Sequence, residues 1–320
     1  MYLFGKVFDI PISNTSPMIK RTLYFGNSAY LSVKHSQLCI RKPNAPDDEK
    51  DHITIPIEDI GIVVADHPQV TFTHTVITSL QENNAVIIWC GPNHLPLAMT
   101  LPLIANDTYT QKVRYQIEAS EPLKKQLWKQ TIVTKIQNQA KLLRLLGYKT
   151  LHLDKMIPRI SSGDTENYEG QAAAIYWQQI LEKYEVTRGR DEGGPNALFN
   201  YGYAILRAVI ARNLVASGCL PVLGIHHTNK YNAYCLADDI MEPYRPIVDR
   251  YILDYIKDKN EIHEELSIED KVYLLKIPVI DISIQGKDSP LMVGAQRTTA
   301  SLVKCYQGTA RKILYPDLLC

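Results

Sequence analysis

The chain has 320 residues, of which 45% are hydrophobic, and a formal net charge of +1 at pH 7. A chain of this length can bury one large or two medium-sized cores. The near-zero charge excludes an overall basic surface, so any DNA contact must come from local patches. No apolar run approaches the ~20 residues of a membrane-spanning helix, so we expect no membrane partner.

The cysteine pattern and the first residues bear on where the protein works. The six cysteines form no Cys-x-x-Cys pair and show no zinc-type spacing. They fit reduced thiols that pack as small hydrophobic side chains, so we expect a cytoplasmic protein. Residues 1–17 lack the basic start and long apolar core of a secretory signal. We interpret them as a leader or an alternative start, with Met18 as the natural first residue.

Residues 21–103 alternate short β-branched and aromatic runs with turn residues. The runs at 30–34 and 37–41, separated by His35-Ser36, are typical of a β-hairpin. Further strands are expected at residues 53–56, 60–64 and 85–90, and one helix at about 75–82. Regular short strands of this kind predict a small β-sandwich-like domain over residues 18–104.

From residue 106 onward, apolar residues recur three or four positions apart, which is typical of helices. Within a predicted helix at 196–218, residues 197–215 are apolar nearly all round and predict a central buried helix. Other helices are expected from 123 to a helix end at Gly147, at 165–185, at 237–260 with a break at its prolines, and at about 290–306, with a brief strand at 279–284. The sequence therefore predicts an α+β multidomain chain, in which a larger all-α catalytic domain over residues 105–320 follows the β domain.

The residues with the most chemical content follow the predicted buried helix. They are Gly224-Ile225-His226-His227 and then Asp238-Asp239-Ile240-Met241-Glu242-Pro243-Tyr244-Arg245-Pro246. Asp239 and Glu242 are three apart, so on a helix they share a face. One imidazole nitrogen plus carboxylate oxygens suits a divalent ion such as Mg²⁺ or Mn²⁺, and Arg245 is close enough in sequence to hold a phosphate beside it. An ion-paired helix start on the surface is the alternative reading.

A second acid occupies a similarly suggestive setting. Ser161-Ser162-Gly163-Asp164-Thr165 is a turn, and Asp164 or Thr165 can cap the helix that follows. Glu169 then lies in the first turns, before Gly170 and three alanines that would let other backbone or a ligand approach closely. An exposed surface acid is the alternative here. Together the two settings suggest metal-assisted attack on a phosphodiester.

Four ordered segments carry a resemblance to a known family. They are Glu169-Gly170-x-Ala172-Ala173-x-x-Tyr176, Pro195-Asn196-Ala197-Leu198-x-Asn200-Tyr201-Gly202-Tyr203, Leu223-Gly224-Ile225-His226-His227 and Asp239-x-x-Glu242-Pro243-x-Arg245-Pro246. The chain resembles the CRISPR-associated spacer integrases, the catalytic subunits of the adaptation complex. The opening Met18-Ile19-Lys20-Arg21-Thr22-Leu23-Tyr24-Phe25-Gly26-Asn27 is similar to that family too. The sequences of the four segments are most similar to those of family members from systems with a single large effector nuclease.

The resemblance implies a β domain joined to a larger helical domain and a DNA endonuclease and integrase that uses Mg²⁺ or Mn²⁺. Glu169, His227 and Glu242 would bind the ion, with Asp239 as an additional ligand or an orienting group. His226 and Asp238 fall outside the family spacing. The implied partners are DNA (a prespacer duplex and the CRISPR repeat), a second copy in a homodimer, and a small ferredoxin-like dimer. A metal-dependent nuclease without strand joining and a non-catalytic DNA-binding scaffold are the alternatives.

Basic residues concentrate in the helical part. Six of them lie along one helical region: Lys124, Lys125, Lys129, Lys135, Lys141 and Arg144. For most of the six we prefer a solvated helix face with lysine stems over apolar surface. Arg188 and Arg190, which flank Gly189, are better candidates for binding a phosphate. Candidates that could extend a DNA track rank lower: Lys287, Arg297, Lys304 and Arg311.

Overall fold

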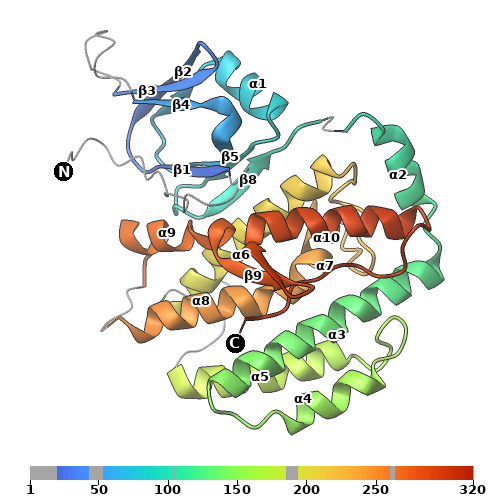
Figure 1. Cartoon of the computed structure of the whole chain (residues 1–320). Coiled ribbons are helices and arrows are strands. Elements are labelled where there is room, and N and C mark those ends of the chain that lie inside the picture. Colours follow the sequence, from blue (N-terminus) through green and yellow to red (C-terminus); the bar gives the residue numbers. More distant parts are fainter. Residues whose placement is uncertain (1–19, 43–52, 104–105, 185–193, 260–263, 320) are drawn as a thin grey trace.

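The computed structural model describes residues 20–42, 53–103, 106–184, 194–259 and 264–319 (Figure 1). Residues 1–17, Arg188 and Arg190 lie outside this part of the chain. In Figure 1 a β-sheet part sits beside a larger helical part, and the two contact each other over one side of a sheet. Within the described ranges, no helix combines the length and apolar character needed to cross a bilayer.

The described residues of the N-terminal part form two four-stranded sheets and one α-helix. Its elements are β1 (Arg21–Phe25), β2 (Ala29–Lys34), β3 (Gln37–Arg41), β4 (Ile53–Pro56), the 3₁₀ turn η2 (Ile57–Asp59), β5 (Ile60–Ala65), β6 (Val70–Phe72), α1 (His74–Glu82), β7 (Val86–Cys90) and β8 (Pro96–Thr100). One sheet has the order β1-β5-β7-β8, with β1 and β7 parallel to β5 and β8 antiparallel to β7. The other has the order β4-β3-β2-β6, in which β6 is parallel to β2.

The predicted hairpin is formed by β2 and β3. Its turn residues His35 and Ser36 have φ angles of 50° and 59°. A two-residue turn of type I′ requires positive φ at both positions, because only then does its twist match that of the strands. The local sequence pattern therefore predicted this element correctly.

Strand β5 is buried at all six positions. Val63 faces the second sheet and α1 in one core, whereas Ile62 and Val64 face the helices in another. A sheet covered on both faces requires apolar residues at successive positions, which explains the unbroken apolar run at 60–65. The two stacked sheets fit the sandwich-like expectation. The parallel pairings and the helix-covered face are features that the spacing of short strands did not indicate.

The C-terminal part is mostly helical. Its elements are α2 (Tyr109–Ile117), α3 (Glu121–Leu145), α4 (Leu151–Met156), η3 (Ile157–Arg159), α5 (Tyr168–Tyr184), α6 (Pro195–Ala216), α7 (Cys235–Met241), η4 (Glu242–Tyr244), α8 (Arg245–Lys257), α9 (Ile268–Leu274), η5 (Ile277–Val279), β9 (Asp281–Ile284), β10 (Lys287–Pro290) and α10 (Leu291–Tyr306). Helix α3 starts at the Ser120 cap and ends before Gly147, whose φ of 89° suits the left-handed position after a helix.

Helix α6 is the predicted central helix. It is buried along most of its length and packs against α7, α8, α9 and α10. The expected all-α architecture is wrong in one respect, because β9 and β10 form an antiparallel hairpin inside this part. The strand pattern at 279–284 had marked its first strand. The second strand, with the sequence Lys-Asp-Ser-Pro, carries no β-branched or aromatic residue and so gave no signal.

Candidate active site

The segment between α6 and α7 carries the two histidines, and one carboxylate fixes its backbone. Asp239 of α7 is fully buried and accepts the N–H groups of Ile225 at 2.7 Å, His226 at 3.0 Å and His227 at 3.2 Å. A Cβ atom at Gly224 would lie 2.3 Å from the His227 carbonyl oxygen and 2.8 Å from Asp239 Oδ2. Only glycine leaves room for this tight loop, which gives the spacing from Gly224 to the histidines a physical cause.

The two histidines have different surroundings. Nδ1 of His227 lies 2.5 Å from Asp239 Oδ1, and this hydrogen bond raises the pKa of His227 above its ordinary value. The other ring nitrogen, Nε2, is thereby left for a ligand, since one nitrogen of the ring is already engaged. His226 instead stacks on Trp128 of α3, with ring centroids 4.1 Å apart and planes 3° apart. Burial lowers the pKa of His226.

Glu169 lies in the first turn of α5, and its position depends on a cap. The backbone N–H groups of Tyr168 and Glu169 each donate to the Asp164 carboxylate at 2.9 Å. Of the two capping residues that the sequence allowed, Asp164 makes these bonds. The close approach expected at Gly170 is made by the Asn167 side chain, whose Nδ2 would lie 2.8 Å from a Cβ there.

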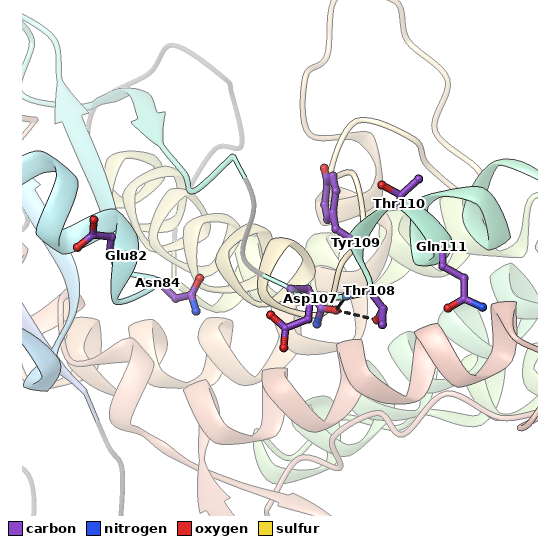
Figure 2. Close-up of a pocket in the computed structure, with 8 residues that line it drawn as sticks. Glu82, Asn84, Asp107, Thr108, Tyr109, Thr110 and Gln111 are labelled. Carbon is purple, nitrogen blue, oxygen red and sulfur yellow. Dashed lines mark hydrogen bonds between the residues drawn. The ribbon is translucent and has the colours of Figure 1, made fainter.

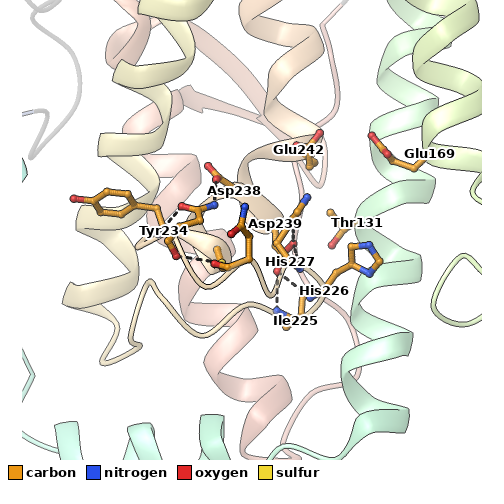
Figure 3. A network of polar contacts seen from close by, with 12 residues as sticks. Thr131, Glu169, Ile225, His226, His227, Tyr234, Asp238, Asp239 and Glu242 are labelled. Atoms are coloured by element: carbon orange, nitrogen blue, oxygen red, sulfur yellow. Dashed lines mark hydrogen bonds and ion pairs between the residues drawn. The ribbon is translucent and has the colours of Figure 1, made fainter. Parts of the chain in front are cut away.

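A buried lysine joins the two glutamates. Nζ of Lys135, on α3, contacts Glu169 Oε1 and lies 2.5 Å from Glu242 Oε2. The side chains of Lys135 and Glu242 are both 6% exposed, and that of Glu169 is 31% exposed. Figure 3 shows the Glu169 side chain extending from α5 toward Glu242 on η4, with His227 beside Asp239. The fold therefore brings together the residues that the two sequence settings had singled out.

Charge balance keeps these buried groups ionised. Burial by itself would raise the pKa of Glu242, but the cations Arg245 and Lys135 outweigh it and lower that pKa. Burial would likewise lower the pKa of Lys135, yet Glu242 and Glu169 outweigh it and raise it. The result is a buried carboxylate–ammonium–carboxylate cluster.

Arg245 does not stand free beside the site. Its Nε lies 3.3 Å from Glu242 Oε1, and its guanidinium carbon lies 4.7 Å from the centre of the Tyr203 ring. The side chain is 31% exposed. Arg245 is thus held against an acid, one of the two roles weighed for it.

The donor set suits a divalent ion, but the present geometry does not gather it. Among the described residues, no three His, Cys, Asp or Glu side chains lie close enough together to hold a metal ion. Lys135 occupies the space between the two carboxylates. Glu242 Oε2 is buried, and Nζ of Lys135 lies 2.5 Å from it. Two carboxylates that share one buried cation, with the His227 imidazole close by, form a donor set that fits a hard cation.

Lys135 is also where the sequence interpretation was wrong. It was grouped with the solvated lysines of its helix, yet it is 5% exposed. It follows Trp128 by seven positions and Thr131 by four, so it shares their buried face. This spacing was a signal that could have separated it from the other lysines of the helix. The stacking of Trp128 on His226 had no such local signal.

Asp238, His94 and the cysteines are not among the candidate ligands of the site. Asp238 accepts Nε of Arg207 at 2.6 Å and Nδ2 of Asn232 at 2.7 Å, so it turns away from Asp239. His94, one of the histidines without a partnered spacing, lies 2.9 Å from Asp66. The five cysteines in the described residues are free, in agreement with the absence of any paired spacing.

The chain is similar in sequence to known proteins. Residues 23–279 match the family described as "CRISPR associated protein Cas1". A CRISPR-associated endonuclease Cas1 from Neisseria meningitidis serogroup C (strain 8013) is 32% identical over 306 residues, covering 94% of this chain and 97% of that protein.

Two solved structures share the fold. A casposase bound to integration product superposes with a TM-score of 0.75 at 19% identity, covering 91% of both chains. A chain of a Cas6-RT-Cas1–Cas2 complex superposes with a TM-score of 0.72 at 18% identity, covering 98% of this chain and 37% of that one. The arrangement of sheets and helices is therefore the one found in these proteins. The chain belongs to the Cas1 family of CRISPR-associated proteins.

Proposed function

We propose that this chain is a metal-dependent DNA endonuclease and integrase that inserts fragments of foreign DNA into a CRISPR array. The observation that carries the proposal is the meeting of Glu169 and Glu242 at one buried cation, beside a histidine held by Asp239. A structural ion pair on the surface would not require two carboxylates from separate segments to share a buried charge. The name of the Neisseria relative, an endonuclease, points to the same chemistry.

Glu169, Glu242 and Nε2 of His227 would hold Mg²⁺ or Mn²⁺, which are ions that prefer such hard donors. The ion would polarise the target phosphate and help to activate the nucleophile. Asp239 would orient His227 rather than bind the ion, because both of its oxygens already accept N–H groups. The Lys135 ammonium must then move off at least one carboxylate to give the ion room.

Arg245 would position Glu242, and the exposed part of its side chain would lie within reach of a phosphate. It would not donate a proton, since the pKa of its guanidinium is too high. In the joining step, the 3′-hydroxyl oxygen of the incoming strand forms a bond to the target phosphorus. The bond to the target strand's own 3′ oxygen breaks, and that oxygen leaves with a proton.

The partners are part of the proposal. Prespacer duplex and CRISPR repeat DNA would be bound by a homodimer, two of which would bridge a small ferredoxin-like dimer. The solved neighbours support the DNA and Cas2-type partners, since one is a casposase bound to integration product and another is a complex that contains Cas2. We further propose a cytoplasmic location and a domain boundary near residues 104–105.

The decisive experiment is strand joining. Short duplexes with free 3′-hydroxyls are mixed with a supercoiled repeat plasmid, the chain and its small partner, in Mn²⁺ or in EDTA. We expect joining in Mn²⁺ only, and its loss in Glu169→Ala and His227→Ala. Glu166→Ala is the matched control, because Glu166 is an exposed acid just before the same helix.

Three results would redirect the assignment. Cleavage without joining would identify a nuclease that lacks integrase activity. DNA binding with no metal-dependent chemistry in the unmodified protein would identify a scaffold subunit. Joining that survives both substitutions would place the reaction elsewhere in the chain.

A further inference from the structure

A basic hollow lies where the two parts of the molecule meet, and its volume is about 640 Å³. It is bordered by Lys20 before β1, by Asn84 after α1, and by residues of α2, α6 and α10. None of its lining residues belongs to α3, α5, α7 or η4, which carry Lys135, Glu169, Asp239 and Glu242. The hollow is thus separate from the candidate active site.

The charge of this hollow is one-sided. No Asp or Glu is among its lining residues, and four cations line it: Lys20, Lys112, Arg212 and Lys304. Amide side chains add further hydrogen-bond donors, including those of Asn84, Asn106 and Asn213. A site with this composition attracts an anion and repels a cation.

Arg212 is the most informative of the four. It is 8% exposed, its Nε donates to the carbonyl of Asn84, and within the described residues no carboxylate pairs with it. Burial lowers the pKa of Arg212 to about 10. Burial and the charge of Arg212 lower the pKa of Lys20, against the opposing charges of Asp59 and Glu58, and both cations line the hollow. A buried, unpaired guanidinium is costly unless an anion completes the site.

The apolar lining and the volume of the hollow indicate which kind of anion would fit. Met292, Val293 and Val303 of α10 add apolar side chains to its lining. Its volume lies in the range of pockets that hold a small molecule of nucleotide size. A second hollow, drawn in Figure 2, shares Asn84 and Asn106 with the basic hollow but also has the acids Glu82 and Asp107 in its lining. We therefore expect an anion in the basic hollow and not in the second one.

We propose that the hollow lined by Lys20, Lys112, Arg212 and Lys304 binds the phosphate group of a deoxynucleotide, either free or as part of a DNA strand. Guanidinium and ammonium groups together match the charge and geometry of phosphate oxygens. The apolar side chains of α10 would accept the base or sugar. This site goes beyond the proposed integrase reaction and does not depend on it.

The test is calorimetric binding to the full chain in EDTA, which removes any metal-held phosphate from the candidate active site. The probes are inorganic pyrophosphate, dAMP, deoxyadenosine, and a short single strand with or without a 5′-phosphate. We expect saturable binding of the phosphate-bearing probes and none of deoxyadenosine. If dAMP binds as tightly as the strand, the hollow is a site for a free nucleotide. If the strand binds much more tightly than dAMP and its affinity falls with added salt, the hollow is a DNA contact.

A double variant, Lys112→Ala with Lys304→Ala, removes two of the cations without touching the buried arginine. We expect it to weaken phosphate binding about tenfold or more, since charge-assisted contacts are lost. The control is Lys257→Ala with Lys276→Ala, two exposed lysines outside the hollow. Absence of saturable phosphate binding, or equal weakening in both double variants, would overturn the proposal. Either result would leave the strand-joining experiment unaffected.

Discussion

Lys135 places one positive charge between two carboxylates that the chain carries on different segments. Without that charge, Glu169 and Glu242 would face each other in a largely buried space, with only Arg245 to offset Glu242. Such repulsion disfavours the folded state and favours any cation that takes the place of the lysine. The same residue therefore bears on stability and on the affinity for a metal ion.

We expect Lys135→Met to lower the free energy of unfolding in EDTA by about 3 kcal/mol, because it leaves a buried charge uncompensated. Mn²⁺ should restore part of the loss, since it binds only the folded form. Denaturant unfolding in EDTA and in Mn²⁺ measures both effects. Lys141→Met is the control: Lys141 lies on the same helix and pairs with an exposed aspartate, so about 1 kcal/mol or less is expected. Equal losses in the two variants would contradict this role of Lys135.

The His227–Asp239 pair predicts a pH dependence. Asp239 stabilises the charged imidazole and raises the pKa of His227, so the neutral ring that a metal needs forms only as the pH rises through that raised value. Asp239→Asn removes the negative charge and should move the midpoint of His227 titration to lower pH. Ring-proton NMR of the metal-free protein measures the midpoint. In the strand-joining assay we expect a loss of about 10- to 100-fold, typical of removing a partner that orients a ligand. An unchanged midpoint would be incompatible with the pairing.

At the scale of elements, the capped N-terminus of α5 sets the direction of the Glu169 side chain. The Asp164 carboxylate satisfies the first two free N–H groups of the helix, and Glu169 supplies one of them. A helix start that frays would therefore move the carboxylate of Glu169 away from Lys135. Cap and candidate ligand are five residues apart and act together.

We expect Asp164→Ala to cost about 1–2 kcal/mol of stability, as the loss of a capping side chain does. It should also weaken Mn²⁺ binding, which titration calorimetry measures. Ser267→Ala removes the capping box of α9, far in sequence from the candidate ligands, and should cost similar stability without changing Mn²⁺ affinity. Equal effects on Mn²⁺ affinity would show that the cap has no specific link to the site.

Sequence patterns predicted elements well where the information is local. The β2–β3 hairpin, the buried α6 and the helix end at Gly147 each depend on residues within a few positions. The β10 strand was missed because it is held by its hairpin partner and not by its own propensity. Lys135 was misjudged because a lysine is usually exposed, although its spacing from Trp128 and Thr131 puts it on the face of α3 that packs against η4 and α5.

At the scale of the whole molecule, one buried aspartate ties the sheet part to the helical part. Asp66, just after β5, accepts the hydroxyl of Tyr24, lies 2.9 Å from His94 Nδ1 and pairs at 2.9 Å with Nζ of Lys271 on α9. Burial would raise the pKa of Asp66, but the hydrogen bonds from Tyr24, Lys271 and His94 outweigh it and lower it. The basic hollow lies at the same junction of sheet and helical parts, bordered by β1, α1 and α10.

Asp66→Asn should cost about 3 kcal/mol near neutral pH, because Lys271 then stays buried without its counter-charge. A carboxyl with a lowered folded pKa stabilises the protein above its unfolded pKa and loses that contribution as the pH falls through the folded value. The variant's stability should thus fall less steeply in that acid range. Unfolding midpoints from pH 2 to 7 measure it, with Asp317→Asn, in an exposed pair, as the control. Parallel curves for Asp66→Asn and the unmodified protein would contradict the prediction.

The sequence by itself determined the strands and helices that have a clear local pattern, the central apolar helix and the two settings that hold Glu169 and the His227–Glu242 segment. These features depend on periodicity and on neighbours along the chain, which a sequence states directly. The tertiary structure alone decided that Lys135 lies between Glu169 and Glu242, that Asp239 holds His227 in place, and that four cations gather without an acid at the junction of the two parts. Each of these depends on segments far apart in the chain, and only packing sets the distance between such segments.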